Sequence, residues 1–143
     1  MKIALALVLA FVAAMSTVAL HYEAIRRLDR FARRSKTAYP ALFAVIAILV
    51  ALHLLEISFY SAIFWLSATI LALGAFDGNI LPSSLDYFYY SAEAYASLGY
   101  GSVAPAGELR LITSIAPLNG LLLLTWSGSF LFSLVEDWRA RAS

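Results

Sequence analysis

The sequence predicts an all-α membrane protein in which three helices cross the bilayer and a short fourth helix enters it between the last two. The 143 residues are 62% hydrophobic and only 13% charged, with a mean hydropathy of +0.82, well above the range of soluble proteins. Three apolar runs are long enough to cross about 30 Å of hydrocarbon. Basic residues gather between the first two runs and after the third. We therefore expect one membrane domain.

The first element, expected over residues 1–22, contains the apolar run from Ile3 to Leu20. Its roughly 18 residues suit a single crossing. A lysine in front of the run and the small residues Thr17 and Ala19 near its end also resemble a secretory signal. In that alternative the segment Met1–Leu20 is cleaved, and the basic segment that follows is left outside the cell.

The second element is a basic segment over residues 23–38. Between Ala24 and Lys36, basic residues outnumber the single Asp29 by five charges, which indicates the cytoplasmic side of a membrane. Apolar residues recur at helical spacing here, which predicts an amphipathic helix. Two interpretations stay open: a helix lying on the inner leaflet, or a solvated linker whose charges only set the orientation. In the first, anionic lipid headgroups contact the arginines at positions Arg26, Arg27, Arg30, Arg33 and Arg34.

The third element, expected as a helix over residues 40–76, holds the apolar run from Ala41 to Phe76. A helix of this length would measure about 54 Å, more than one crossing needs. Either a tilted helix or a span that bends near residues 67–69 accommodates it. A polar loop follows at residues 74–82.

The last element is the apolar run from Leu109 to Val135, within a helix expected over residues 108–136. Trp138, Arg139 and Arg141 follow it as an interface anchor. Both basic clusters then lie on one side of the membrane. This arrangement places the N-terminus outside, the C-terminus in the cytoplasm and the loop between the last two spans outside.

Between the last two spans, residues 84–102 are expected to form a short helix and a glycine-containing loop. Ser83 and Asp86 have the spacing of a capping box at a helix start. The loop is Ser97-Leu98-Gly99-Tyr100-Gly101, whose glycines tolerate positive φ. Irregular backbone at membrane depth must be buried in protein or line an aqueous cavity. The negative end of the short helix favours a cation at this place.

This loop and the helix before it resemble the pore helix and selectivity filter of bacterial potassium channels. The family has W-W-S-V-E-T-A-T-T-V-G-Y-G-D, and this chain has Y-Y-S-A-E-A-Y-A-S-L-G-Y-G-S from Tyr89 to Ser102 without a gap. Pro105 and Arg110 also have counterparts, and the likeness covers about residues 85–135. The chain is similar to small bacterial potassium-channel-family proteins, with two transmembrane helices and a pore loop, plus an extra N-terminal helix.

The resemblance implies a homotetrameric channel of the bacterial inner membrane that conducts K⁺ passively, so that residues 39–143 form the pore domain. Backbone carbonyls would bind K⁺ at Ser97, Leu98, Gly99 and Tyr100, and Gly101 completes the filter. Glu93 and Ser102 would support the filter from behind. The permeant ion is the only ligand implied, and no cofactor is expected.

Two departures from the family pattern affect ion preference. Ser102 stands where the family has aspartate, and Leu98 stands where it has valine. We therefore expect a potassium preference weaker than that of well-matched members. A weakly selective cation channel and a non-conducting accessory or assembly subunit with the same fold are the alternatives.

The last helix carries a possible cavity lining and a hinge. One helix face holds Leu121, Leu124, Gly128 and Phe132. The resemblance makes this face the cavity lining, with Phe132 as a constriction, whereas simple packing against other helices is the alternative. Pro117 should kink the helix just before Gly120, which falls at the family's hinge glycine.

Ionisable residues inside a membrane suggest a functional role by default. His53 and Glu56 are three residues apart and share a helix face. They form either a proton-sensitive pair or a structural contact to Asn119. The chain has no cysteine and its two histidines are far apart in sequence, so the ligand spacing typical of a zinc site is absent. Without a nucleophile–base pair or a phosphate-binding loop, neither an enzyme nor a nucleic-acid-binding protein is expected.

Overall fold

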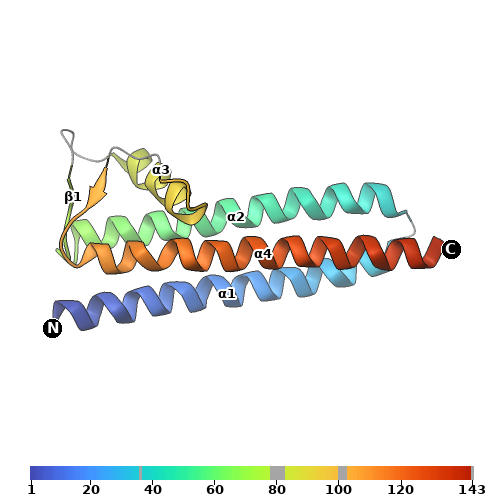
Figure 1. Cartoon of the computed structure of the whole chain (residues 1–143), viewed down its shortest axis with the longest axis horizontal. Helices are drawn as coiled ribbons and strands as arrows, with labels where there is room; N and C mark the ends of the chain where they lie inside the picture. Colours follow the sequence, from blue (N-terminus) through green and yellow to red (C-terminus); the bar gives the residue numbers. More distant parts are fainter. Residues whose placement is uncertain (36, 78–82, 100–102, 143) are drawn as a thin grey trace.

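The computed structural model describes residues 1–35, 37–77, 83–99 and 103–142. Its helices are α1 (Lys2–Arg34), α2 (Ala38–Thr69), α3 (Ser84–Tyr95) and α4 (Leu109–Ala142). The strands β1 (Phe76–Asp77) and β2 (Ala104–Pro105) pair antiparallel, with Phe76 opposite Pro105. Three long helices lie side by side, and α3 packs on α2 and α4 at the end that holds the strands (Figure 1). The expected all-α fold with three long apolar helices is confirmed.

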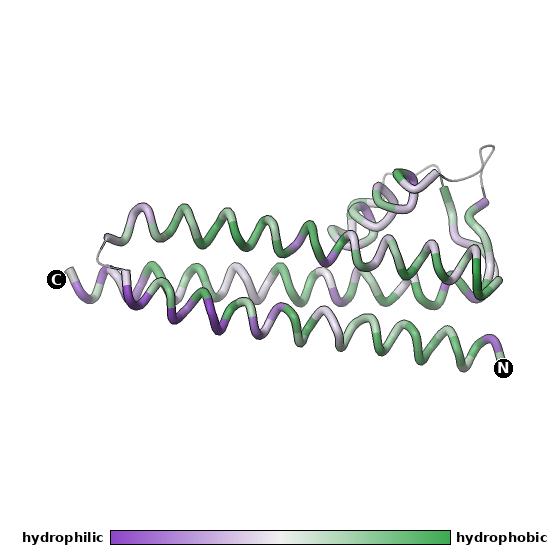
Figure 2. Tube along the Cα trace, turned by 180° about the vertical axis from the view of Figure 1, so that it is seen from behind, coloured by the Kyte–Doolittle hydropathy of each residue, from purple (hydrophilic) through white to green (hydrophobic). Residues whose placement is uncertain are grey.

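The three long helices have the length and composition of membrane spans. Their most apolar windows have mean hydropathies of 2.6 in α1, 2.5 in α2 and 1.6 in α4. The N-terminus and the strands lie at one end of the bundle, and the C-terminus lies at the other with the α1–α2 turn (Figure 1). Hydrophilic residues of α1 gather at the end with the C-terminus (Figure 2). The chain is a membrane protein.

The basic segment 23–38 is not a separate helix, because α1 continues through it without a break to Arg34. Leu28 and Ala32 of this half are buried against Leu49 of α2 and Leu134 of α4. The side with Leu28 and Ala32 is therefore covered by protein while Phe31 stays exposed, so the segment is neither a separate helix lying on the leaflet nor a solvated linker. Arg33 also forms an ion pair with Asp137 of α4, 2.9 Å between Nη1 and Oδ2.

A stripe of small residues along α1 forms its contact with the bundle. Ala6, Ala10, Ala13 and Ala14 are at most 8% exposed, and they recur every three or four residues. Small side chains at such spacing let two helix backbones approach closely inside a membrane. The most extensive packing of α1 is with α4. The N-terminal helix is thus an integral part of the fold in this structure.

The second helix ends at Thr69 and not near residue 76 as expected for a straight helix. The N–H of Leu73 donates to the carbonyl of Ser67, and Ala72 and Gly74 have φ angles of 47° and 148°. A Cβ on Gly74 would lie 2.0 Å from the carbonyl oxygen of Ala106. This close approach requires glycine and turns the chain into β1. Of the two ways to accommodate the long run, the bend near residues 67–69 is confirmed.

The capping box predicted at the start of α3 is confirmed. The Asp86 N–H donates to Ser83 Oγ at 3.3 Å, and the Ser83 N–H donates to Asp86 Oδ2 at 2.6 Å. The Ser83 N–H lowers the pKa of the Asp86 carboxyl. Because this pKa is depressed, the cap contributes fully above the ordinary aspartate pKa and is lost as pH falls through the lowered value.

The fourth helix extends to Ala142, beyond the expected end at 136. Pro117 lies inside it, and the helix continues through this position. Proline removes one backbone hydrogen bond and crowds the preceding turn. Both α1 and α3 pack against this helix. The kink expected at Pro117 stays a prediction.

We predict that Ala10→Leu weakens the docking of α1, because three extra carbon atoms cannot fit between helices at a 2% exposed position. The expected loss is about 1–3 kcal/mol of stability. The thermal unfolding midpoint of detergent-solubilised protein measures it. Ala19→Leu is the matched control, since Ala19 is exposed on the same helix. Equal midpoints for the two variants would contradict the packing described here.

Candidate functional site

The backbone leaves α3 through an irregular segment at residues 96–99. The N–H of Ser97 donates to the carbonyl of Ala94 at 3.0 Å, and the N–H of Leu98 donates to that of Glu93 at 2.9 Å. Ser97 has φ 58° and Gly99 has φ 64°, both in the left-handed region. All three residues from Ser97 to Gly99 are exposed in the single chain. Tyr100, Gly101 and Ser102 lie outside the described residues.

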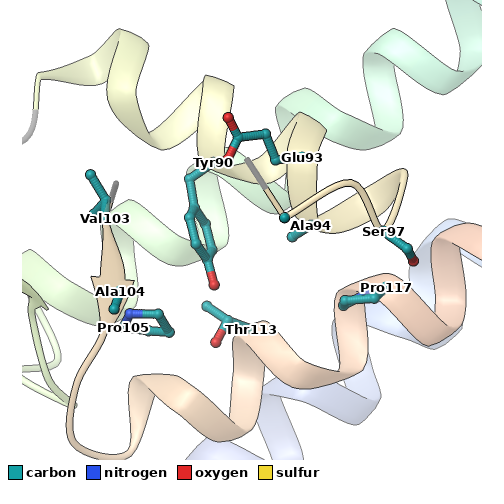
Figure 3. A pocket seen from close by; sticks show the side chains of 10 residues that line it. Tyr90, Glu93, Ala94, Ser97, Val103, Ala104, Pro105, Thr113 and Pro117 are labelled. Atoms are coloured by element: carbon teal, nitrogen blue, oxygen red, sulfur yellow. The ribbon is translucent and has the colours of Figure 1, made fainter. Parts of the chain in front are cut away.

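A cavity of about 470 Å³ lies between this segment, α3, β2 and the first half of α4. Tyr90 reaches from α3 toward Thr113 of α4, and Pro117 and Ser97 border the same space (Figure 3). Glu93 lines the cavity and is partly buried. Its expected partner, Ser102, lies outside the described residues, so the support of the loop by these two side chains stays a prediction.

The last residue of α3 abuts the middle of α4. A Cβ on Gly120 would lie 2.1 Å from the carbonyl oxygen of Tyr95 and 3.0 Å from its Cα. No side chain fits between two backbones at this separation. Gly120 was expected as a hinge, and the structure gives it a packing role: it admits the end of α3 onto α4.

The side chain of Tyr95 enters a buried group of polar residues built around Glu56 of α2. The Tyr95 hydroxyl donates to Glu56 Oε2 at 2.5 Å. The other carboxylate oxygen, Oε1, lies 2.9 Å from Nδ1 of His21 on α1. Glu56 and His21 are both fully buried. One carboxyl group thus connects α1, α2 and α3.

Two further side chains close this group into a circuit. His53 of α2 places Nδ1 2.9 Å from the Tyr95 hydroxyl and Nε2 3.1 Å from Oγ of Ser127 on α4. Ser127 Oγ in turn lies 3.2 Å from Nε2 of His21. We call this circuit the polar ring, and it includes a residue from each helix. Its members are His21, His53, Glu56, Tyr95 and Ser127.

The polar ring has one proton for each of its five contacts. Because Tyr95 donates to Glu56, His53 must donate to the Tyr95 hydroxyl through Nδ1. Ser127 donates to Nε2 of one histidine and accepts from Nε2 of the other, and in either direction one proton serves each contact, the one between His21 and Glu56 included. Each member is satisfied and the net charge is zero. A buried ionisable group is tolerated in a membrane under these conditions.

Three members of the polar ring also have the donor atoms that a metal ion prefers. Ligand atoms of His21, His53 and Glu56 lie within 4.8 Å of one another. Imidazole nitrogen and carboxylate oxygen are typical of zinc sites. Each of these side chains already has a hydrogen-bond partner in the ring, so a metal would have to displace protons. Sequence spacing did not predict this group, because its two histidines come from different helices.

The contact expected between the His53–Glu56 pair and Asn119 is wrong. Asn119 Nδ2 donates instead to Thr17 Oγ1 at 2.6 Å and to the Tyr60 hydroxyl at 3.0 Å. His53 Nδ1 and Glu56 Oε2 are 3.2 Å apart, as their shared face suggested. Sequence reasoning missed His21 and Thr17. They continue the stripe of small residues on α1 at four-residue spacing. This spacing is the feature of the sequence that could have identified them.

The helix face of Leu121, Leu124, Gly128 and Phe132 points away from the rest of the chain. These residues are exposed, Phe132 to 71%, and a Cβ on Gly128 would meet nothing within 4 Å. Packing within the chain is therefore excluded for this stripe. A cavity lining or a contact with another chain fits its exposure.

The sequence model of a family described as ion channel matches residues 40–137, which run from the start of α2 to near the end of α4. The chain belongs to this ion-channel family. The match includes α3, the irregular segment and the exposed face of α4, and α1 precedes it. No curated protein and no solved structure matched the chain. Ion channels of this kind assemble as oligomers in membranes, and the match indicates a channel and not an enzyme.

We predict opposite effects for the same substitution at two glycines of α4. Gly120→Ala should destabilise the protein by about 1–3 kcal/mol, because its Cβ collides with the Tyr95 carbonyl. Gly128→Ala has open space and should be neutral or stabilising by up to about 1 kcal/mol, since alanine favours helix. Thermal unfolding in detergent measures both. A stable Gly120→Ala protein would show that α3 does not abut α4.

Proposed function

We propose that this chain forms a homotetrameric cation channel of a bacterial-type inner membrane and conducts potassium ions passively. The observation that carries the proposal is the left-handed backbone of Ser97 and Gly99 directly after the C-terminal end of α3. Backbone in alternating conformations can turn successive carbonyls toward one axis and replace the hydration shell of an ion. The carbonyls proposed to bind K⁺ are those of Ser97, Leu98, Gly99 and Tyr100, followed by Gly101.

Two features support an assembly of several chains around this segment. One chain supplies one row of carbonyls, and a filter needs such rows on all sides of the ion. The segment Ser97–Gly99 and the face with Leu121 and Phe132 are both exposed in the single chain. A closed fourfold ring of chains would cover them or line a water-filled cavity with them. In such a ring Phe132 is the proposed constriction.

The chemistry around the segment supports a moderate preference for potassium. The last turn of α3 points its negative end toward the filter and favours cations in general. Ser102 offers no carboxylate at the outer mouth, and Leu98 replaces a β-branched residue. Glu93 remains as a carboxyl group beside the filter, lining the cavity of Figure 3. We propose that potassium is preferred over sodium by less than in well-matched family members.

We propose that the end of the bundle with the C-terminus faces the cytoplasm, because the basic residues of α1 and α4 gather there. A groove of about 330 Å³ on α1 is lined by Arg27, Arg30, Phe31 and Arg34. Three guanidinium groups beside an aromatic ring suit the phosphate and glycerol of an anionic lipid headgroup. Arg26 and Arg33 belong to the same basic surface and pair with Glu23 and with Asp29 and Asp137, and Arg27 of the groove also pairs with Glu23, 2.7 Å between Nε and Oε1.

We predict that purified protein in liposomes carries a potassium flux larger than its sodium flux, and that Gly99→Ala abolishes it. Gly99 has φ 64°, a conformation that costs an L-residue about 1–2 kcal/mol in each chain. Ala19→Leu protein, altered on the exposed side of α1, should conduct normally. Equal fluxes of the two ions would contradict the potassium preference.

Native mass in detergent separates the channel from a non-conducting accessory subunit. The channel requires a mass of four chains. A monomer or dimer, or a tetramer whose flux is the same with and without Gly99→Ala, would contradict the proposed pore.

We predict that replacing the three groove arginines by glutamine weakens binding of anionic lipid. Each arginine near a charged surface contributes about 1 kcal/mol. Native mass spectrometry of protein from membranes with phosphatidylglycerol should show fewer retained lipids for the Arg27→Gln/Arg30→Gln/Arg34→Gln variant. Arg139→Gln/Arg141→Gln, at the same end of the bundle, is the charge control. Equal lipid retention in both variants would contradict a specific groove.

A further inference from the structure

We propose that α1 is a working part of the channel, because His21 positions the filter segment through the polar ring. The ring fixes Tyr95, and Ser97 follows Tyr95 by two residues. His21 is thus a positioning residue that acts on the backbone at residues 97–99 without touching it. This inference rests on the proposed function of that segment as the ion filter.

Tyr95 is held at both of its ends, the hydroxyl and the backbone. Its hydroxyl has two partners, Glu56 at 2.5 Å and His53 at 2.9 Å. Its backbone lies against Gly120, and the residue is only 1% exposed. Neither end of Tyr95 can shift without breaking hydrogen bonds or colliding with α4. The starting point of the irregular segment is therefore fixed relative to the bundle.

The contact between the Tyr95 hydroxyl and Glu56 depends on His21. Glu56 binds the Tyr95 hydroxyl with one oxygen and His21 with the other. Removing the imidazole leaves Glu56 Oε1 and Ser127 without their partners on α1, in a fully buried environment. An unpaired carboxylate oxygen is strongly disfavoured there. Glu56 must then reorient toward His53, which alters the contact that holds Tyr95.

Outside the polar ring, the surroundings offer Glu56 no other charged partner among the described residues. The titratable groups around it are His21 from α1, His53 and Tyr60 from α2, and Tyr95 from α3. From α4 come Ser127 and the Trp126 ring, which do not titrate. Among the described residues, His53 is therefore the one imidazole left beside Glu56 when His21 is removed, and it already binds Tyr95 and Ser127.

Two residues of α1, Thr17 and His21, contribute to the contacts around Tyr95. Thr17, one turn before His21, accepts from Asn119 of α4, and Asn119 also binds Tyr60. The Tyr60 and Tyr95 rings lie 6.4 Å apart. Both α1 residues precede the region matched by the ion-channel family, residues 40–137. The N-terminal helix thus contributes two polar contacts next to the end of α3 that the matched region does not contain.

The test compares Tyr95→Phe with Tyr87→Phe in two measurements. Both tyrosines are buried on α3, but Tyr87 packs its ring on Phe76 and is outside the polar ring. In liposomes, Tyr95→Phe should lower the potassium-to-sodium flux ratio about fivefold, the size expected for one lost hydrogen bond. Hydrogen exchange should be faster at the Leu98 amide, which donates to Glu93. Tyr87→Phe should change neither quantity.

His21 is tested by the same measurements with a rescue. His21→Ala should lower the flux ratio and speed exchange at Leu98, and His21→Asn should restore part of both, since its amide can still donate to Glu56. Ser16→Ala, which removes only a local bond to the Val12 carbonyl, is the α1 control. If His21→Ala lowers the melting temperature while the flux ratio and the Leu98 exchange stay normal, the ring is only structural and the proposal is overturned.

A failure of the proposed function gives a different result. If wild-type liposomes carry no flux but Leu98 exchange responds to Tyr95→Phe and His21→Ala, the segment is not a filter, while its positioning by α1 stands. Unchanged exchange in both ring variants overturns the positioning in either case.

Discussion

Glu56 is a carboxyl group buried in an apolar bundle, and the arrangement of the helices depends on how it is satisfied. Its two oxygens bind His21 of α1 and Tyr95 of α3, while His53 and Ser127 close the circuit. A single missing partner would leave a polar group without compensation in a medium that offers no water. The four helices therefore have one mutual arrangement in which all five side chains are satisfied.

The same constraint explains how an irregular backbone segment can keep its shape at the edge of the bundle. The N–H groups of Ser97 and Leu98 donate to carbonyls of the last turns of α3, so the geometry of this segment depends on the fixed end of that helix. Tyr95 supplies that end through its hydroxyl and through its close approach to Gly120. Rigid helices that carry a short functional loop are a recurrent solution, because the loop itself has little cohesive energy of its own.

Local features of this protein could be predicted from sequence, and long-range contacts could not. Apolar runs and the capping box at Ser83 depend on neighbouring residues only, and these were anticipated, whereas the helix end at Thr69 was expected only as one of two alternatives. The continuity of α1 was not, because the partner of Leu28 and Ala32 is protein from distant helices. The link from His21 to Glu56 spans 35 residues and that from His21 to Ser127 spans 106. Spacing within one helix carries no information on such pairs.

The polar ring acts as one unit, and a double-mutant cycle tests this property most directly. The unfolding midpoints of His21→Ala, Tyr95→Phe and the double variant would be compared in detergent, with the Leu98 amide exchange followed in parallel. Members of one network are not additive. The double variant should therefore lose little more than the worse single variant. Losses that simply add would show two independent contacts, and the account of a closed ring would be contradicted.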